Sequence, residues 1–384
     1  MSPRTEPFVV MLKPFGSRCN MRCSYCYYLS NRMSNGKEMD YDLLETVIRN
    51  YFSSSRGPVV SFVFHGGEPT VGGIDFYRKA VELEKKYLPE GFQCWNNLQT
   101  NGLGIDNEWC RFLKENNFDV GVSIDGIMED HDFYRRDSNG HPTFERIRDN
   151  IALMGSYGIK PDILCTVNDR TVKDPLKIYS YLRDLDTGWI QFIPVVNLRD
   201  GLPKKGSITA EEYGRFLCEI FNEWVHKDFD RVGVQLFMET LNVYSGGEPT
   251  LCWLSRECGK APVIEADGRV YSCDHFVDQD HLIGDVSEEP LSDIMEKPFQ
   301  KDFGRNKRLG LSSKCHECRY LKVCNGGCPK DRVIPNGKTE PVYYLCEGLK
   351  QYFEASSKPL RYLSYLMKRG YGKKEAMRLL NERE

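Results

Sequence analysis

The sequence predicts an α/β protein: a parallel β-sheet with helices outside it, followed by a smaller domain organised by cysteines. Two observations carry this prediction. Strand-like and helix-like segments alternate six times in the first half of the 384-residue chain, and eight cysteines gather after residue 250, where long periodic segments are scarce. Regular alternation of strands and helices is typical of a parallel sheet, because each helix returns the chain to the same edge for the next strand.

The expected strands are short runs of β-branched and aromatic residues that end in turn residues. They span residues 8–12, 59–64, 92–98, 119–124, 162–167 and 189–196. The expected helices place apolar residues at helical spacing. They span residues 40–52, with Asp40 as the N-cap, and 74–88, 108–116, 143–157, 174–185, 210–227 and 235–244. Ligands of such sheets bind at the carboxyl ends of the strands, so we expect the functional site there.

The composition excludes several classes of partner. The formal net charge is −3 and the isoelectric point is about 6.2, so no basic field attracts nucleic acid or anionic lipid. No apolar stretch approaches the roughly 20 residues that span a membrane, and the charged and proline residues before the first strand do not fit a signal peptide. We therefore expect a cytoplasmic protein whose 15 cysteines form no disulfide framework and whose clustered cysteines bind metal.

Three cysteines lie in one short loop directly after the first expected strand, with the spacing C-x3-C-x2-C: Cys19, Cys23 and Cys26. Closed zinc sites and four-iron clusters both take four protein ligands. Three thiolates on a [4Fe–4S] cluster leave one iron open for a further ligand, as a catalytic cluster requires. The alternatives at this point are a zinc knuckle completed by His65 or a distant cysteine, and three buried thiols without a metal.

Eight further cysteines follow in the last third of the chain, which is the number that two fully ligated four-iron clusters need. They are Cys252, Cys258, Cys273, Cys315, Cys318, Cys324, Cys328 and Cys346. Two zinc sites are the alternative. The other four cysteines lie on periodic segments, and we expect them to be small buried hydrophobic residues. These are Cys94, Cys110, Cys165 and Cys218.

The C-x3-C-x2-C loop, the turn Gly66-Gly67-Glu68-Pro69 and the C-terminal cysteine pattern together resemble the radical S-adenosylmethionine (SAM) enzymes with a SPASM domain. Shorter strings resemble, more narrowly, the anaerobic sulfatase-maturating enzymes. They are Phe64-His65-Gly66-Gly67-Glu68-Pro69, Leu98-Gln99-Thr100-Asn101-Gly102, Ser123-Ile124-Asp125-Gly126, Gln191-Phe192-Ile193-Pro194 and Tyr271-Ser272-Cys273-Asp274-His275-Phe276. The resemblance covers residues 8–352. It implies a partial (β/α)6 TIM-like barrel over residues 1–230, a SPASM domain with auxiliary iron–sulfur clusters over 231–350, and a helical segment over 351–384.

The resemblance also implies which residues bind the cofactors, which would be three [4Fe–4S] clusters and SAM. Cys19, Cys23 and Cys26 match the ligands of the cluster that binds SAM. One auxiliary cluster matches Cys252, Cys258, Cys273 and Cys328, and the other matches Cys315, Cys318, Cys324 and Cys346. The residues that match contacts to SAM are Tyr25, Gly66, Gly67, Glu68 and Ser123. Wall packing for Tyr25 and turn capping for Ser123 are the competing structural roles.

Two residues match catalytic positions of that family: Asp274, as the proton acceptor, and Tyr28. Asp274 directly follows the expected cluster ligand Cys273. Clusters with thiolate ligands carry negative charge, so we expect the pKa of Asp274 to be raised, which would make its carboxylate a better base. The competing interpretations are an aspartate of a turn and a tyrosine of the core.

The reaction that the resemblance implies is the oxidation of a cysteine or serine in a sulfatase polypeptide, within a Cys/Ser-x-Pro-x-Arg segment, to Cα-formylglycine. A 5′-deoxyadenosyl radical from SAM would remove a Cβ hydrogen, and a flavodoxin- or ferredoxin-type protein would donate electrons. One alternative is a SPASM enzyme that crosslinks or epimerises a ribosomal peptide. A more distant alternative is a non-catalytic iron–sulfur or zinc-binding module. No nucleic acid or membrane partner is expected.

Overall fold

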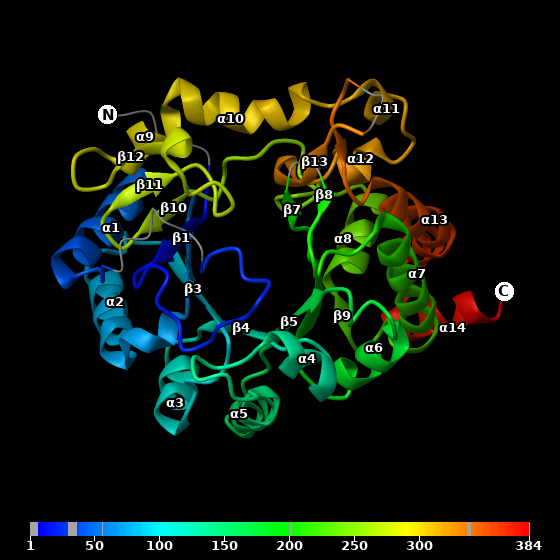
Figure 1. The fold of residues 1–384 in the computed structure, drawn as a ribbon, viewed down its shortest axis with the longest axis horizontal. Helices are drawn as coiled ribbons and strands as arrows, with labels where there is room; N and C mark the ends of the chain where they lie inside the picture. The colour runs from blue at the N-terminus through cyan, green and yellow to red at the C-terminus, as the bar shows by residue number, and fades with distance from the viewer. Residues whose placement is uncertain (1–6, 30–36, 56, 200–201, 336–338, 384) are drawn as a thin grey trace. The chain divides into compact units, whose positions relative to one another are not determined.

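The chain is known from a computed structural model that describes residues 7–29, 37–55, 57–199, 202–335 and 339–383. These residues form two compact units (Figure 1). The first unit comprises Met1–Ser123, Asp132–Pro161 and Cys258–Arg305, and the second comprises Ile124–His131, Asp162–Glu257 and Asn306–Glu384. Helices α4 (Met128–Tyr134) and α10 (Pro298–Leu309) each contain a boundary. Neither unit is therefore one continuous piece of chain.

The first unit has a mixed sheet in the strand order β12-β11-β10-β1-β2-β3-β4. Its strands are β1 (Val10–Lys13), β2 (Val59–Phe64), β3 (Gln93–Thr100), β4 (Asp119–Ser123), β10 (Val263–Glu265), β11 (Arg269–Tyr271) and β12 (Leu282–Asp285). Strands β10, β1, β2, β3 and β4 pair in parallel, whereas β11 and β12 complete an antiparallel edge. Strand β2 alternates: Val60, Phe62 and Phe64 are buried and the residues between them are more exposed, which gives the sheet one apolar face.

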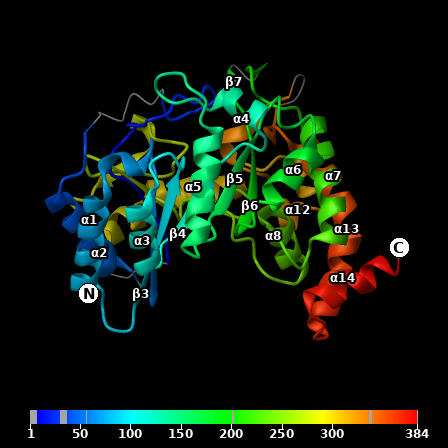
Figure 2. The ribbon, with the colours of Figure 1, turned by 90° about the horizontal axis from the view of Figure 1, so that it is seen from below.

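Helices cover that apolar face, and Figure 2 shows α1, α2 and α3 beside β3 and β4. The helical segments of the unit are α1 (Tyr41–Ser54), η1 (Pro69–Gly72), α2 (Ile74–Tyr87), α3 (Asn107–Glu115), α5 (Phe144–Ser156), η2 (Gln279–His281) and α9 (Leu291–Glu296). Asp40 caps α1, as predicted: its side chain accepts a hydrogen bond from the N–H of Leu43 (2.8 Å). The rings of Phe64 on β2 and Tyr77 on α2 meet edge to face, with centroids 5.2 Å apart, so α2 packs directly on the sheet.

One carboxyl group is buried between a helix and the sheet of the first unit. Glu84 on α2 is 5% exposed and accepts a hydrogen bond from Nδ2 of Asn96 on β3 (2.8 Å). Burial raises the pKa of Glu84 from 4.5 to about 7, although the bond from Asn96 acts in the opposite direction. The folded protein therefore binds more protons than the unfolded chain, and its stability falls as the pH rises from about 4.5 to about 7.

We expect Glu84→Gln to raise the thermal unfolding midpoint of the anaerobic holoenzyme at about pH 8 by the equivalent of roughly 1–3 kcal/mol, and by much less near pH 5. The amide stays neutral at every pH and still accepts the bond from Asn96. Glu82→Gln is the matched control, because Glu82 lies on the same helix with its side chain 65% exposed. An equal shift of the midpoint at both pH values would contradict this account.

The second unit has a short parallel sheet, β5-β6-β9, and two hairpins, β7-β8 and β13-β14. The strands are β5 (Asp162–Val167), β6 (Trp189–Pro194), β7 (Leu198–Arg199), β8 (Leu202–Pro203), β9 (Gly233–Val234), β13 (Arg332–Val333) and β14 (Val342–Tyr343). The helical segments are α6 (Pro175–Arg183), α7 (Ala210–Lys227), α8 (Gln235–Tyr244), α11 (Ser313–His316), α12 (Leu321–Cys324), η3 (Pro329–Asp331), α13 (Cys346–Lys368) and α14 (Lys373–Asn381). Helix α13 lies along α7, and the two approach so closely that a Cβ on Gly348 would lie 2.1 Å from the carbonyl oxygen of Ala210.

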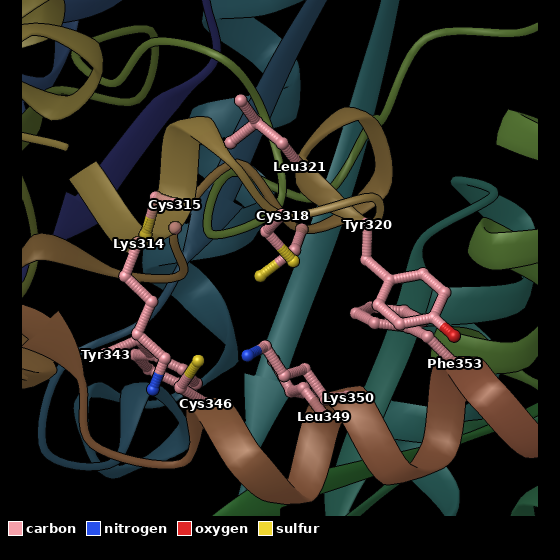
Figure 3. A pocket seen from close by; sticks show the side chains of 12 residues that line it. Lys314, Cys315, Cys318, Tyr320, Leu321, Tyr343, Cys346, Leu349, Lys350 and Phe353 are labelled. Carbon is pink, nitrogen blue, oxygen red and sulfur yellow. The ribbon is translucent and has the colours of Figure 1, made fainter. Parts of the chain in front are cut away.

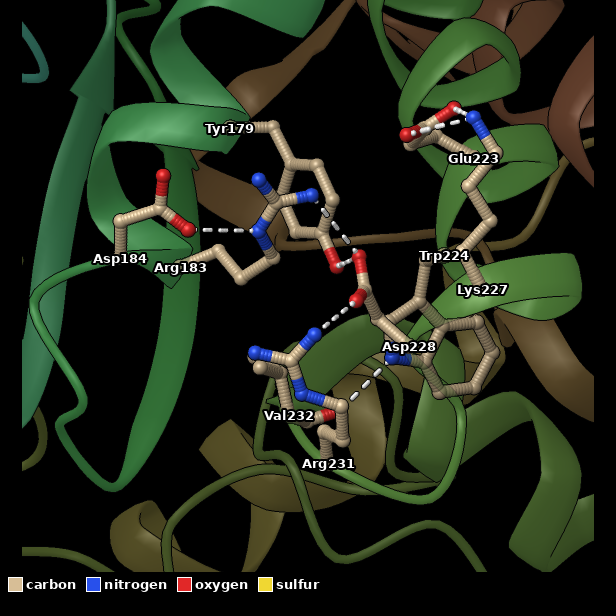
Figure 4. A network of polar contacts seen from close by, with 9 residues as sticks. All are labelled: Tyr179, Arg183, Asp184, Glu223, Trp224, Lys227, Asp228, Arg231 and Val232. Carbon is tan, nitrogen blue, oxygen red and sulfur yellow. Dashed lines mark hydrogen bonds and ion pairs between the residues drawn. The ribbon is translucent and has the colours of Figure 1, made fainter. Parts of the chain in front are cut away.

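A buried carboxylate ties the end of α7 to α6 in the second unit (Figure 4). Asp228 is 1% exposed and accepts hydrogen bonds from the hydroxyl of Tyr179 (2.9 Å) and the guanidinium group of Arg183 (3.4 Å). Arg231, three residues farther along the chain, adds a contact at 3.5 Å. These donors compensate the buried charge, so removing any one of them would leave Asp228 less well paired where the two helices meet.

The structure confirms the predicted α/β class with its parallel strands and alternating helices. The predicted ranges 59–64, 162–167, 210–227 and 235–244 coincide with β2, β5, α7 and α8. Strands β10, β11 and β12 were not predicted. In the part of the chain that the structure describes, no helix is both long enough and apolar enough to cross a membrane. The domain limits at residues 230 and 350 stay a prediction.

Candidate active site

The C-x3-C-x2-C loop follows β1 in the first unit, and another segment of that unit pairs with its backbone. The N–H of Arg22 donates to the carbonyl of Arg136 (2.8 Å), and the N–H of Ser24 donates to the carbonyl of Tyr134 (3.1 Å). The three cysteines of the loop are partly exposed; they are Cys19, Cys23 and Cys26. The backbone of the loop is thus fixed, while its cysteines stay partly accessible.

The surroundings of Cys19 suit a thiolate that binds iron. Its Sγ accepts hydrogen bonds from the backbone N–H of Met21 (3.3 Å) and from Nδ2 of Asn101 (3.7 Å). Burial raises the pKa of the Cys19 thiol to about 11, and the N–H of Met21 only partly offsets this effect. Binding to a metal deprotonates a thiol, and N–H groups directed at sulfur tune iron–sulfur clusters. The residues of the loop therefore fit an iron–sulfur cluster with three protein ligands.

The Gly-Gly turn after β2 lies directly against this loop. The N–H of Gly67 donates to the carbonyl of Gly16 (2.8 Å). A Cβ on Gly67 would lie 2.1 Å from the carbonyl oxygen of Arg18, and Gly66 has a φ of +124° that favours glycine. We expected both glycines to let the backbone approach SAM. In the structure, the space beside Gly67 is filled by the backbone of the cysteine loop.

Glu68 completes the turn as a buried anchor. It is 1% exposed, and burial raises its pKa, although the bonds it accepts act in the opposite direction. Its oxygens accept bonds from the N–H and hydroxyl of Thr70 (3.0 and 2.7 Å), the hydroxyl of Thr100 (2.7 Å) and the N–H of Asn101 (2.6 Å). With these bonds, Glu68 ties the turn to the end of β3 and to Asn101, whose amide reaches Cys19.

The two other residues expected near SAM also lie in the first unit. The hydroxyl of Tyr25 accepts a hydrogen bond from Arg135 (3.0 Å), and its ring lies 5.5 Å from that of Tyr134. The hydroxyl of Ser123, at the end of β4, accepts a bond from Nε2 of Gln99 (3.5 Å). Both side chains therefore have partners within the protein, and their contacts to SAM stay predictions.

Asp274 lies in a polar cluster and is 17% exposed. One of its oxygens forms an ion pair with Lys13, and the other accepts a hydrogen bond from the hydroxyl of Tyr27. Burial alone would raise the pKa of Asp274, but Lys13, with His65 and His275 nearby, lowers it below its ordinary value. This lowered pKa arises from the protein's own groups. The raised pKa that we expected from the charge of a bound cluster stays a prediction, and the buried Lys13 acts against it.

Tyr28, the other residue matched to a catalytic position, contacts Glu265. It is 3% exposed, and its hydroxyl donates to Glu265 on β10, 2.7 and 2.8 Å from the two oxygens. The tyrosine that donates a hydrogen bond to Asp274 is Tyr27, which precedes Tyr28 in the chain and is 49% exposed. Sequence reasoning did not single out Lys13, Tyr27 or Glu265. The only signal in the sequence is that Lys13 ends an apolar strand.

Four of the expected ligands line one pocket of the second unit; they are Cys315, Cys318, Cys324 and Cys346. Figure 3 shows the sulfur atoms of Cys318 and Cys346 and the ammonium group of Lys350 directed into it. Lys314 also lines the pocket. Burial raises the pKa of Cys324 to about 12, and a backbone N–H from Gly326 acts in the opposite direction. Four thiols beside two cations suit a cluster whose thiolates carry negative charge.

The cysteines expected for the other auxiliary cluster are divided between the units: Cys258 and Cys273 belong to the first, and Cys252 and Cys328 to the second. Among the residues that the structure describes, no three Cys, His, Asp or Glu side chains are arranged to hold a single metal ion. A four-iron cluster attaches its ligands to four different irons, so its thiolates stand farther apart than the ligands of one ion. Of the four cysteines outside the ligand sets, Cys110 and Cys165 are buried, as expected, while Cys94 and Cys218 are partly exposed.

The sequence of this chain matches known protein families and named enzymes. The radical SAM superfamily matches residues 14–182, and the SPASM iron–sulfur cluster-binding domain matches residues 241–319. A serine-type anaerobic sulfatase-maturating enzyme from Bacteroides thetaiotaomicron is 39% identical over 374 residues, which cover 92% of this chain and 90% of the relative. The chain belongs to the anaerobic sulfatase-maturating enzymes.

Both named types of sulfatase-maturating enzyme match. A cysteine-type anaerobic sulfatase-maturating enzyme from Clostridium novyi is 34% identical over 369 residues, covering 92% of this chain and 96% of the relative. The solved structure of anSMEcpe with bound AdoMet and Kp18Cys peptide has a TM-score of 0.87 and 30% identity, and the match covers 94% of this chain and 99% of that one. This sulfatase-maturating enzyme is therefore a radical SAM oxidoreductase with iron–sulfur clusters and a C-terminal SPASM domain, as the sequence predicted.

Proposed function

We propose that this enzyme oxidises a cysteine or serine of a sulfatase polypeptide, within a Cys/Ser-x-Pro-x-Arg segment, to Cα-formylglycine. The serine-type and cysteine-type sulfatase-maturating relatives support this choice of substrate. The observation that carries the chemistry is Asp274, a partly exposed carboxylate directly after Cys273, in the same unit as the C-x3-C-x2-C loop. A base at this position can take a proton from a substrate that reacts near that loop.

The change at the substrate is a two-electron oxidation. Bound SAM and its cluster would supply the radical that removes one hydrogen atom from Cβ. Asp274 would accept the proton of the hydroxyl or thiol, and a bound auxiliary cluster would supply the acceptor for the remaining electron. A serine becomes an aldehyde directly. A cysteine becomes a thioaldehyde, which water hydrolyses to the aldehyde and hydrogen sulfide.

The ligand sets of three [4Fe–4S] clusters belong to the proposal. Cys19, Cys23 and Cys26 would hold the cluster that binds SAM. Cys252, Cys258, Cys273 and Cys328 would hold one auxiliary cluster, and Cys315, Cys318, Cys324 and Cys346 the other. The pocket that the last four line supports this set. The SAM contacts would come from Tyr25, Gly66, Gly67, Glu68 and Ser123, with Glu68 acting through the turn that it anchors.

The remaining parts of the proposal concern organisation and partners. The barrel would span residues 1–230, the SPASM domain 231–350 and the terminal helices 351–384. Tyr28 would support the catalytic residues around Asp274 through its hydrogen bond to Glu265. A flavodoxin- or ferredoxin-type protein in the cytoplasm would donate electrons. The formal net charge of −3 supports the absence of a nucleic acid or membrane partner.

The test is anaerobic incubation of the reconstituted enzyme with SAM, a reductant and matched peptides that carry Cys-x-Pro-x-Arg, Ser-x-Pro-x-Arg or Ala-x-Pro-x-Arg. We expect mass spectrometry to detect formylglycine in the first, the second or both, and never in the alanine peptide. Cleavage of SAM that leaves both reactive peptides unmodified would contradict the proposal. It would favour a SPASM enzyme that crosslinks or epimerises another peptide.

A further inference from the structure

Lys13 is a buried cation that the reaction described above does not use. It ends β1, and its side chain is 0% exposed. Its Nζ lies 3.7 Å from the centroid of the Tyr28 ring and 3.9 Å from Oε1 of Glu265, and it contacts Oδ1 of Asp274. A buried ammonium group is costly unless carboxylates or aromatic faces compensate its charge. The placement of this group therefore depends on three partners, and the two carboxylates among them come from a distant part of the sequence.

Of the two carboxylates around Lys13, Asp274 is the closer and the more exposed. Glu265 is 2% exposed and lies opposite Lys13 in the pairing of β10 with β1. Both of its oxygens already accept the hydroxyl of Tyr28 (2.7 and 2.8 Å). The side chain of Asp274 is instead 17% exposed, and the residue belongs to no strand of the sheet. Glu265 and Tyr28 thus hold Lys13, and Lys13 in turn holds Asp274.

The two oxygens of Asp274 differ in what covers them. Oδ1 meets Lys13, which is enclosed and belongs to the central sheet. Oδ2 meets the hydroxyl of Tyr27, a residue that is 49% exposed. A substrate can displace the contact from an exposed tyrosine more readily than the contact from a lysine enclosed in the sheet. Oδ2 is therefore the oxygen that can receive a proton from a substrate while Oδ1 stays fixed.

We propose that Lys13 is a positioning residue for formylglycine formation: it fixes Oδ1 of Asp274 and thereby directs Oδ2 toward the substrate. The inference rests on the proposed function and adds a residue to it. Without Lys13, the carboxylate can rotate away between removal of the hydrogen atom and transfer of the proton. Small errors in the position of a reacting group cost large factors in rate. The loss then appears in product formation and not in the cleavage of SAM.

The experiment compares the wild type, Lys13→Met and Lys13→Arg as reconstituted holoenzymes with the reactive peptide. It measures iron content, 5′-deoxyadenosine and formylglycine. In Lys13→Met we expect iron content and 5′-deoxyadenosine within about twofold of the wild type, and formylglycine per 5′-deoxyadenosine lower by about tenfold or more. Lys13→Arg should recover part of this ratio, because the guanidinium group also pairs with a carboxylate. A crystal structure of Lys13→Met should show Asp274 turned away from its wild-type orientation.

The double variant Lys13→Met/Glu265→Gln guards against a folding defect, since it removes the buried charge that the single variant leaves unpaired. It should show the same low ratio. Glu82→Gln serves as the surface control and should match the wild type. An unchanged ratio, an unmoved Asp274, or a parallel loss of 5′-deoxyadenosine and formylglycine would overturn the proposed role of Lys13. Absence of formylglycine with the wild type would instead overturn the proposed function.

Discussion

Replacing Asp274 by Asn is expected to lower formylglycine formation by at least about 100-fold, which is the smaller end of the usual contribution of a general base. The amide has the shape of the carboxylate but cannot take the substrate proton. It also leaves Lys13, which is fully buried, without its closest negative charge. The cleavage of SAM should continue, because the cysteine loop and the turn at Gly67 are untouched. The measurement is formylglycine by mass spectrometry and 5′-deoxyadenosine by chromatography, from the same anaerobic reaction.

Asp280→Asn is the matched control, because Asp280 is an exposed carboxylate a few residues farther along the same unit. It should form formylglycine as the wild type does. If Asp274→Asn also kept its product yield, Asp274 would not be the base. Equal losses of 5′-deoxyadenosine and formylglycine would show that Asp274 supports the cofactor site instead.

Gly67→Ala should displace the cysteine loop, although Gly67 itself lies in the neighbouring turn after β2. The added Cβ would lie 2.1 Å from the carbonyl oxygen of Arg18 and 2.7 Å from the backbone of Ser17. These are backbone atoms, so the turn and the loop must move apart. We expect the reconstituted protein to lose roughly four of about twelve irons, the content of one cluster, and SAM cleavage to fall by about tenfold or more. Iron analysis and 5′-deoxyadenosine formation measure the two effects.

The matched control for this substitution is Gly155→Ala, in α5 of the same unit. Apart from its chain neighbours and the backbone of its own helix, no atom lies within 4 Å of the Cβ that it would add. An alanine in a helix is favoured over glycine by roughly 0.5–1 kcal/mol, so the control should unfold at a slightly higher temperature with its iron content unchanged. Full iron content and SAM cleavage in Gly67→Ala would show that the loop tolerates the displacement.

Periodicity and turn residues were sufficient to predict the long elements of the fold. Strand β2 ends just before the Gly-Gly turn, and α7 begins at Ala210, directly after its N-cap Thr209, which forms a capping box with Glu212. Strands β10 and β11 have three residues each, which is too short for any periodic signal. The pairing of β10 with β1 also joins residues about 250 positions apart, such as Lys13 and Glu265. Local sequence patterns contain no information on such a contact.

In the candidate site, too, local sequence revealed the residues of continuous motifs but not the contacts that the fold creates. Cysteine spacing and short motifs pointed to the C-x3-C-x2-C loop, the Gly-Gly turn and Asp274, because each lies within one continuous stretch. The partners of Asp274 come from three separate stretches, and only the fold assembles them: Lys13 from β1, Tyr27 from the loop and His65 from the end of β2. For this reason the sequence did not reveal the protein groups that lower the pKa of Asp274. Burial raises the pKa of Asp274, and Lys13, His65 and His275 together outweigh it.

Strand β10 has a consequence for any attempt to separate the two halves of the chain. It pairs with β1 in parallel and places Glu265 beside Lys13. A chain cut after residue 230 would leave the edge of β1 unpaired, and an open strand edge favours aggregation. It would also leave an ammonium group without either of its carboxylates. The segment that binds SAM is thus no independent module: its first strand is completed by residues from the cysteine-rich half of the sequence.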